Sequence, residues 1–326
     1  MDSPFPPGSL FLAPMVALSH RPLRTLVREY GGLDYACTEM ASAAALVSGS
    51  PYDEWYLDPE PEPGKTILQF YTIKPERLVE ALERCAAMPV FGADINFGCS
   101  APHIERSGGG VAWMADPPRA AELVRLARAA WPKPLSAKLR IGPEEDYDAL
   151  RDFCLRLVDA GIDFLTLHPR LKSEKLRRSS RWDYVAALAR ELPVPVVGNG
   201  DVRSFADYRD KLAAYAPAGV MIGREAVRRP WIFALIRGLE ADPDFGLEVD
   251  LEGTAYRMLD LIEGLLPPDF HLTRARRFFF YYCDNFRFAH HIKWKTQNAE
   301  SLDDMRRALA AYFLEVPEDR RARQTG

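Results

Sequence analysis

Residues 134–170, PLSAKLRIGPEEDYDALRDFCLRLVDAGIDFLTLHPR, contain the pattern on which the fold prediction rests. An apolar, β-rich run (134–142) precedes a segment whose apolar residues recur at three- and four-residue spacing (147–161), and a second β-rich run follows (163–170). This spacing is typical of an amphipathic helix between two buried strands. The stretch therefore predicts one βαβ unit of a parallel sheet.

The same alternation extends over most of the chain. Further amphipathic helical patterns lie at residues 75–88 and 118–131. The β-rich runs number eight: 9–16, 34–40, 65–72, 93–99, 134–142, 163–170, 195–200 and 219–226. Eight strands alternating with helices favour an α/β fold, the (β/α)8 TIM barrel, for which roughly 250 residues is typical. The alternative is a doubly wound open sheet, which would more often carry a glycine fingerprint after its first strand; residues 11–20, FLAPMVALSH, have none.

Beyond Leu239 the pattern changes. A polar segment, residues 242–246, leads into long helical patterns without further strand signals. We therefore expect two domains, a TIM-barrel catalytic domain over residues 1–240 and an all-helical domain over residues 245–326.

The composition argues against several classes of protein. With 326 residues, 48% of them hydrophobic and 27% charged, the chain can bury a full-sized core. It has no run near the roughly 18 consecutive apolar residues of a membrane span and no signal-peptide pattern, so we expect a cytoplasmic protein without membrane contact. Its five cysteines are spread widely without a CxxC pair, and Cys283 with His290 and His291 fits no zinc spacing, so we expect neither disulfides nor a metal.

The net charge of −4 hides an uneven distribution of charge along the chain. Residues 271–326 hold eleven Lys and Arg against seven Asp and Glu, a balance of +4, so the preceding 270 residues carry −8. A second basic run lies at residues 172–181 and consists of Lys172, Lys175, Arg177, Arg178 and Arg181, with Glu174 among them. Solvated surfaces and nucleic-acid contacts are both consistent with charge alone.

Polar or glycine residues close seven of the eight strand candidates, and a methionine closes the first. They are Met15, Glu39, Gln69, Asn96 with Cys99, Lys138 with Arg140, His168 with Arg170, Asn199 with Asp201, and Gly223 with Arg224. TIM-barrel active sites form at these strand ends. A single Lys or His there is usually a surface residue, but an unpaired polar group inside an apolar run costs about 1–3 kcal/mol unless something satisfies it. The set therefore indicates a bound polar ligand.

Two of these strand ends indicate a phosphate site. Residues 198–201, GNGD, and 219–225, GVMIGRE, close the seventh and eighth strand candidates, where backbone N–H groups can approach a phosphate and Arg224 can add charge. Lys138 is suited to stabilise negative charge on a reduced flavin ring, with Gln69 and His168 beside it. The alternative for Lys138 is a pairing with a carboxylate at the rim.

Cys99 closes the fourth strand candidate, in DINFGC (94–99). A cysteine on a strand is more often an inert core residue. This one precedes the run Gly108, Gly109 and Gly110, which indicates an exposed thiol under a flexible loop. Such a thiol can act as a general acid, a role that typically contributes about 10²–10⁴-fold in rate.

At these motifs the chain resembles the dihydrouridine synthase family, from about Leu12 to residue 310. The matching segments are LAPMVALSHRPLR (12–24), TEMAS (38–42), LQFYTIKPERL (68–78), DINFGC (94–99), SGGGVAW (107–113), AKLRIG (137–142), LHPR (167–170), GNGDV (198–202) and VMIGREAVRRPWIF (220–233). Their order and spacing make the resemblance specific. Residues 274–309 resemble the family's RNA-binding domain more loosely.

The resemblance implies an FMN-containing oxidoreductase that takes electrons from NADPH and passes a hydride to C6 of a uridine in tRNA while a cysteine protonates C5. It makes Cys99 the acid and assigns Asn96 and Arg170 to the RNA substrate, with the basic run 172–181 beside them. The FMN contacts that it implies are Pro14, Met15, Gln69, Lys138, His168, Asn199, Gly200, Asp201, Gly223 and Arg224. Residues 1–240 are then the FMN-binding domain and residues 245–326 the RNA-binding domain of a monomeric protein.

Three residues depart from the family pattern: Ser100 replaces the usual proline, His103 a lysine, and Pro169 a glycine or alanine. They lie around the cysteine and the RNA-facing mouth, so they leave the choice of RNA and of uridine open. Two other functions also remain open. One is another FMN-dependent barrel that acts on a small molecule, which would not need a net-positive helical tail. The other is a catalytically inactive RNA-binding homologue.

Overall fold

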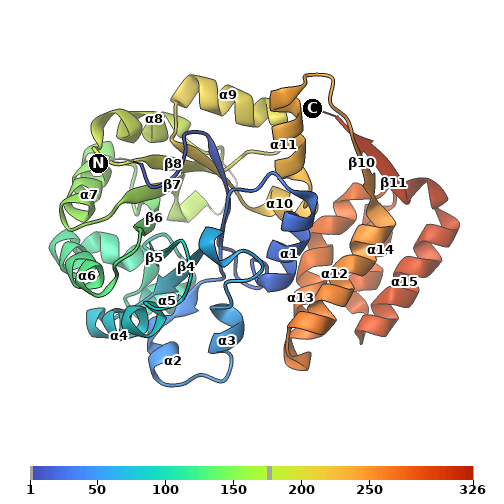
Figure 1. Cartoon of the computed structure of the whole chain (residues 1–326), viewed down its shortest axis with the longest axis horizontal. Helices are drawn as coiled ribbons and strands as arrows, with labels where there is room; N and C mark the ends of the chain where they lie inside the picture. The colour runs from blue at the N-terminus through green and yellow to red at the C-terminus, as the bar shows by residue number, and fades with distance from the viewer. Residues whose placement is uncertain (1–2, 175–177, 326) are drawn as a thin grey trace.

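Eight parallel strands close into a barrel (Figure 1). The computed structural model describes residues 3–174 and 178–325. The ring closes because β2 pairs with both β1 and β4, and β1 pairs with β9. In ring order the strands are β1 (Ser9–Leu12), β2 (Tyr35–Cys37), β4 (Thr66–Tyr71), β5 (Gly92–Asn96), β6 (Leu135–Gly142), β7 (Phe164–Leu171), β8 (Val196–Asn199) and β9 (Gly219–Ile222), and the two-residue β3 (Ala41–Ser42) also pairs with β4. The predicted (β/α)8 fold is confirmed.

The predicted helices surround this barrel. In α7, the Asp146 carboxylate accepts a hydrogen bond from the Ala149 N–H at 2.9 Å and begins the helix, and the face of Leu150, Phe153 and Leu157 is buried. The helices of this part are α1 (Arg21–Tyr30), α2 (Ala43–Val47), α3 (Asp53–Tyr56), α4 (Pro75–Cys85), α5 (Pro102–Arg106), α6 (Pro117–Ala130), α7 (Tyr147–Asp159), α8 (Trp182–Glu191), α9 (Phe205–Tyr215), α10 (Arg224–Arg228) and α11 (Ile232–Ala241). Short 3₁₀ turns are η1 (Pro63–Lys65), η2 (Gly110–Ala115) and η3 (Lys172–Glu174).

An apolar plug fills the N-terminal end of the barrel. Phe5, which precedes β1, packs edge-on against Phe11 and Phe164 with ring centroids 5.0 and 5.1 Å apart. Val197 and Met221 belong to the same buried cluster. Because this end is filled with side chains, any open space in the barrel lies at the C-terminal ends of the strands.

Several strands end earlier than the apolar pattern suggests. β1 ends at Leu12 and is followed by a loop, whereas β9 ends at Ile222 and Gly223 leads directly into α10. In the loop after β1 the Met15 carbonyl accepts hydrogen bonds from the N–H groups of Leu18 and Ser19. The chain therefore turns after β1, and Pro14 and Met15 of this loop lie at the mouth of the barrel.

The C-terminal part is a bundle of four helices with one small sheet. The helices are α12 (Leu251–Leu265), α13 (Pro268–Tyr282), α14 (Ala289–Asn298) and α15 (Leu302–Glu315), with 3₁₀ turns η4 (Cys283–Asn285) and η5 (Pro317–Asp319). β10 (Leu247–Asp250) and β11 (Arg321–Gln324) form an antiparallel pair that the sequence did not predict. Of β10 only Val249 is buried, so the pair has almost no apolar alternation to detect.

The bundle packs against the barrel through α1 and α10 (Figure 1). Tyr30 of α1 hydrogen-bonds Thr254 of α12, and its ring packs against Trp231, which in turn packs edge-on against Tyr282 of α13. Since α10 directly follows β9, this contact brings α13 next to the C-terminal end of the barrel. Within the described residues, no helix is both long and apolar enough to cross a membrane.

Candidate active site

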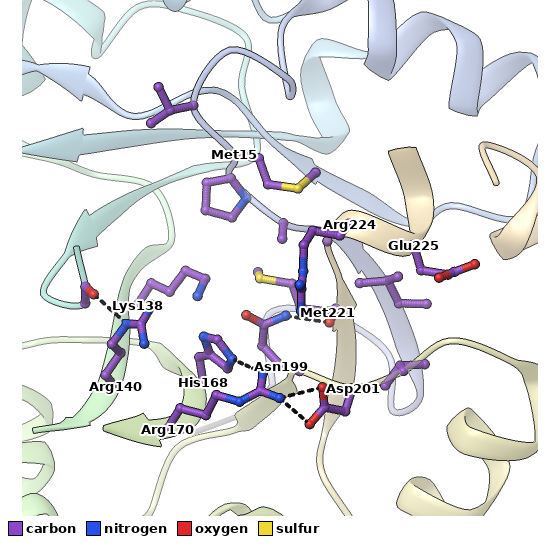
Figure 2. Close-up of a pocket in the computed structure, with 18 of the residues that line it drawn as sticks. Met15, Lys138, Arg140, His168, Arg170, Asn199, Asp201, Met221, Arg224 and Glu225 are labelled. Carbon is purple, nitrogen blue, oxygen red and sulfur yellow. Dashed lines mark hydrogen bonds and ion pairs between the residues drawn. The ribbon is translucent and has the colours of Figure 1, made fainter. Parts of the chain in front are cut away.

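A cavity of about 510 Å³ opens at the C-terminal ends of the strands. Figure 2 shows Lys138, His168 and Arg224 directed toward its central space. All thirteen site residues proposed from the sequence line it: Pro14, Met15, Gln69, Asn96, Cys99, Lys138, His168, Arg170, Asn199, Gly200, Asp201, Gly223 and Arg224. The structure therefore brings together residues from seven strand ends that are up to 210 positions apart in the sequence.

Lys138 presents an unpaired cation to the cavity. Within the described ranges, no carboxylate lies within ion-pair distance of its Nζ, so it is not the rim lysine of the alternative interpretation. Burial, with repulsion from Arg140, lowers the pKa of Lys138 to about 8. Arg140 itself is held by the Gly98 carbonyl at 3.0 Å. The site thus offers a desolvated positive charge to a ligand that carries negative charge.

His168 is neutral in this environment. Burial lowers the pKa of His168 to about 2, and the charges of Lys138 and Arg140 act in the same direction. Its Nε2 lies 3.1 Å from Arg170 Nη1. Because a guanidinium can only donate, Nε2 is the acceptor and the ring proton sits on Nδ1. Gly200 is required beside it, since a Cβ there would lie 2.9 Å from the His168 ring and the backbone has φ +118°.

Arg170 is committed to the cavity wall rather than to the solvent. Its Nη2 donates to both carboxylate oxygens of Asp201 at 2.7 Å, and its Nε donates to the Arg178 carbonyl at 2.6 Å. Asp201 also accepts from the Ser180 N–H at 2.7 Å. The guanidinium is buried and its hydrogen bonds orient His168 and Asp201, while a contact of Arg170 with RNA stays a prediction.

The neighbouring basic run is also largely paired. Lys172 bonds Glu105, and Arg181 forms ion pairs with Glu145 and Glu174. Arg178 is 75% exposed and 4.0 Å from Glu174. Lys175 and Arg177 lie outside the described residues. Of the described charges in this run, Arg178 is the one that extends into solvent.

Cys99 lies half-buried in the cavity wall, unlike the other four cysteines, which are buried. Its N–H donates to Asn96 Oδ1 at 2.8 Å, and its carbonyl accepts from the Val111 N–H at 2.9 Å. Gly110 permits this approach, because a Cβ there would lie 2.4 Å from the Cys99 carbonyl oxygen. The predicted loop is instead largely regular structure: the segment forms α5 and η2, joined through Gly108 and Gly109, and the Trp113 indole N–H bonds the Thr72 carbonyl at 2.8 Å.

The floor of the cavity between β4 and β5 is a chain of buried hydrogen bonds. Gln69 Nε2 donates to Asp94 Oδ2 at 2.7 Å, and Asn96 Nδ2 donates to Gln69 Oε1 at 3.0 Å. Ser136 donates to the other Asp94 oxygen at 2.6 Å. Burial raises the pKa of Asp94 to about 6, so the carboxyl is largely ionised at pH 7.5.

Glu39 is the strand-end residue that does not reach the cavity. It accepts a hydrogen bond from the Ala17 N–H at 2.5 Å and lies 3.7 Å from Arg274 of α13. Ala17 has a left-handed backbone, φ +64°. Glu39 therefore fixes the backbone of the loop after β1 and links this loop to α13 of the helical bundle.

Several residues of the cavity wall were not predicted from the sequence, among them Arg203, Arg228, Tyr281 and Asp284. Arg228 lies one helical turn after Arg224, and its buried Nε has no hydrogen-bond partner in the part of the chain that the structure describes. Its i, i+4 spacing from Arg224 could have pointed to it. No local signal marks Tyr281 and Asp284, because they come from the helical bundle.

The described residues contain no group of three or more His, Cys, Asp or Glu arranged to hold a metal ion. The groups that line the cavity are instead one thiol, a neutral imidazole, three carboxamides (Gln69, Asn96 and Asn199), and six cations (Lys138, Arg140, Arg170, Arg203, Arg224 and Arg228) against three carboxylates (Asp201, Glu225 and Asp284). Such a set suits an anionic, hydrogen-bonding ring system with a phosphate.

Comparison with known proteins agrees with this chemistry. A tRNA-dihydrouridine(16) synthase from Cupriavidus necator is 33% identical over 240 residues, 71% of this chain and 74% of that protein. A probable tRNA-dihydrouridine synthase from Aquifex aeolicus is 31% identical over 257 residues, 75% of this chain and 79% of that protein. A mouse tRNA-dihydrouridine(47) synthase-like protein, whose name includes NAD(P)(+), is 30% identical over 234 residues, but the chain covers 36% of its length. The family model described as dihydrouridine synthase matches residues 11–317, and the chain therefore belongs to the dihydrouridine synthase family.

Proposed function

We propose that this protein reduces uridine to 5,6-dihydrouridine in tRNA, with FMN as its bound cofactor and NADPH as the electron donor. The observation that carries the proposal is the position of Cys99 and Lys138 in one cavity. Asn96 of β5 pairs in register with Lys138 of β6, and Cys99 follows three residues later. A proton donor and a cation thus face the same space from neighbouring strands, as a reaction that adds a proton and a hydride across a double bond requires.

The residues of the cavity fit FMN. The cavity has a volume of about 510 Å³, which lies within the range of roughly 300–1,000 Å³ for small-molecule sites. Arg203 and Arg224 are exposed at the ends of β8 and β9, where a ribityl phosphate is bound in TIM barrels. The unpartnered Nε of Arg228 is a further donor in the same wall. Gln69 and Lys138 would hold the pyrimidine edge of the ring, Lys138 as the cation and Gln69 through its amide.

In the proposed reaction, FMN, once bound and reduced, would be the source of the hydride that adds to C6 of the uracil. The Cys99 thiol gives its proton to C5, and the resulting thiolate regains a proton from water, which reaches it because the residue is half-exposed. Asn96 holds the uracil edge next to the thiol. The base has to leave its stack before it enters so enclosed a site.

The helical bundle, residues 245–326, is the proposed RNA-binding domain, and residues 1–240 are the proposed catalytic domain. Residues 271–298 hold six Lys and Arg against one acidic residue, Asp284. Exposed aromatic rings lie among these cations: Lys293 is 4.8 Å from the Phe280 ring and Lys295 is 5.5 Å from the Trp294 ring. Aromatic faces interleaved with cations are the surface that stacks unpaired bases and follows a phosphate backbone.

The proposal is tested by mapping dihydrouridine, by mass spectrometry, in tRNA from cells with and without this chain. We expect one or more uridine positions to lose the modification when the chain is removed. An unchanged map would contradict the proposal, and a purified chain that binds FMN but leaves tRNA unchanged would favour a reductase of small molecules.

FMN affinity should fall as the pH rises through about 8. The depressed pKa of Lys138, about 8 before the cofactor binds, means that its charge is present below this pH and is lost above it. Fluorescence titration of the flavin-free protein with FMN between pH 6.5 and 9.5 measures the effect, which reaches at most about tenfold per pH unit above the pKa. The variant Lys138→Met should bind more weakly and lose this pH dependence.

Trp294→Ala should raise the KM for tRNA and leave kcat nearly unchanged. Stacking of a base on an aromatic ring is worth about 1–3 kcal/mol, so we expect a rise in KM of about fivefold or more. Initial rates at several tRNA concentrations measure it. Leu314→Ala, which removes an apolar side chain that is also exposed but lies on α15 without a cation partner, is the matched control. Equal KM values for the two variants would contradict the proposed RNA surface.

A further inference from the structure

The carboxylate of Asp94 lies beneath the cavity and is linked to it through Gln69, whose amide lines the cavity. Asp94 is 3% exposed and is absent from the residues that line the cavity. It accepts from Ser136 Oγ at 2.6 Å and from Gln69 Nε2 at 2.7 Å. These partners lie on β6 and β4, in register with Asp94 on β5, so the three side chains meet at one level inside the barrel.

This carboxylate determines which way two amides point. An ionised carboxylate can only accept, so the Gln69 amide has to turn its NH₂ toward Asp94 and its oxygen away. That oxygen then accepts from Asn96 Nδ2 at 3.0 Å. The remaining Asn96 oxygen is left to accept two backbone N–H groups, those of Gly98 at 3.1 Å and Cys99 at 2.8 Å.

The hydrogen bonds therefore run in one direction, from the backbone N–H of Cys99 to a buried negative charge. Each amide in the series has a donor side and an acceptor side, so reversal at one end forces reversal along the whole series. Gln69 and Asn96 both also face the cavity. Their free lone pairs and N–H groups are those that a ring system in the cavity would meet.

We propose that Asp94 is a positioning residue. Through Gln69 and Asn96 it determines which amide groups face the ligands and where the Cys99 backbone lies in the cavity wall. This inference rests on the proposed function for its catalytic consequence. The geometric part, control of the Cys99 segment, stands on the hydrogen bonds alone.

Asp94→Asn is the first test, because it keeps the shape of the side chain, removes the charge and leaves one acceptor oxygen where the carboxylate has two. The Gln69 amide is then free to turn over, and Asn96 loses its fixed orientation toward Cys99. We expect kcat per FMN-loaded molecule to fall about tenfold or more, with FMN retained. We also expect iodoacetamide to alkylate Cys99 about fivefold or more faster, because the Cys99 backbone is released. Mass spectrometry of flavin-free and FMN-loaded protein measures the alkylation rate.

A rescue variant separates positioning from simple support of the barrel. In the double variant D94N/Q69E the carboxylate moves from β5 to β4, where it can still accept from Asn96 Nδ2. Asn96 then keeps its direction, and the alkylation rate of Cys99 should return to within about twofold of the wild-type value. Turnover should recover less than the alkylation rate, because a glutamate at position 69 has no NH₂ group to donate to the cofactor.

Asp163→Asn is the matched control at the opposite end of the barrel. The Asp163 carboxylate accepts from the Leu135 N–H at 2.7 Å and pairs with Arg128 at 2.8 Å. Its replacement should lower the melting temperature and change neither kcat nor the alkylation rate. Should Asp94→Asn not fold, Gln69→Leu, which removes the middle amide, is expected to give the same faster alkylation in flavin-free protein.

The proposal would be overturned if Asp94→Asn had the wild-type kcat and the wild-type alkylation rate. The same holds for Gln69→Leu where that variant replaces it. A double variant that fails to restore the alkylation rate would also overturn the proposal. If the wild-type protein itself formed no dihydrouridine, the proposed function would fail. The alkylation rates and their rescue would still decide whether Asp94 positions the Cys99 segment.

Discussion

Cys99→Ala is expected to keep its flavin and to lose dihydrouridine formation by a factor of about 10²–10⁴, the usual contribution of a positioned general acid. The thiol is half-buried in the cavity wall, and its backbone is fixed by Asn96 and Val111 on either side. Alanine fits this backbone without changing these contacts. Flavin absorption of the purified variant and single-turnover conversion of a tRNA transcript by the reduced enzyme measure the two parts of the prediction.

The control for this variant is Cys154→Ala. Cys154 is fully buried on α7, and burial holds the pKa of its thiol above the usual range. Its replacement should cost some stability and leave turnover per folded molecule unchanged. If Cys99→Ala kept the full rate, Cys99 could not be the acid, and the proton would have to come from another group at the cavity wall.

Lys138→Met is expected to lower the rate at which NADPH reduces the bound FMN by about 10²–10³-fold, since negative charge develops on the flavin ring in this step and a preorganised charge at such a position contributes this much in other enzymes. Methionine has nearly the length of the lysine side chain and removes the cation. The described residues place no carboxylate in ion-pair contact with Lys138, so its loss leaves no buried anion unpaired. Stopped-flow absorption of the oxidised flavin on mixing with NADPH measures the step.

A second lysine variant shows whether the effect belongs to the site. Lys133 lies at the N-terminal side of β6, where its ammonium bonds the carbonyls of Ala86 and Met88. Lys133→Met should affect stability alone. Equal rates of flavin reduction by NADPH in wild-type protein and Lys138→Met would contradict the assigned role.

The barrel was predictable because its strands and helices have different periodicities. Residues 134–142, 147–161 and 163–170 became β6, α7 and β7 with shifts of one or two residues at their ends. The cavity residues were predictable for a related reason: a closed parallel barrel places every C-terminal strand end on the same face, so order along the chain gives position around the mouth.

The remaining features depend on contacts that no local pattern carries. Arg170 lies at the end of a strand, where an arginine could face RNA. Its Nη2 instead donates to both carboxylate oxygens of Asp201, 31 residues later, and this contact holds the side chain in the cavity wall. Lys172 is paired with Glu105, a partner from another βα unit. Such pairings arise when side chains from distant segments meet, and sequence spacing does not determine them.

Glycine was the least reliable guide. The run Gly108, Gly109 and Gly110 suggested a flexible loop, but Gly110 is needed for a close approach to the Cys99 carbonyl, and the N–H groups of Gly108 and Gly109 are hydrogen-bonded. Gly110 thus serves here to reach a left-handed backbone conformation that other residues rarely adopt.

The most direct test of the account is a single turnover of the purified chain, reconstituted with FMN and reduced by NADPH, on an unmodified tRNA transcript. The account predicts that flavin reoxidation without oxygen matches, mole for mole, the appearance of a uridine that has gained two hydrogen atoms, and that Cys99→Ala keeps the flavin and abolishes most of this product. Reoxidation with no change in the transcript, or a protein that binds no FMN, would contradict it.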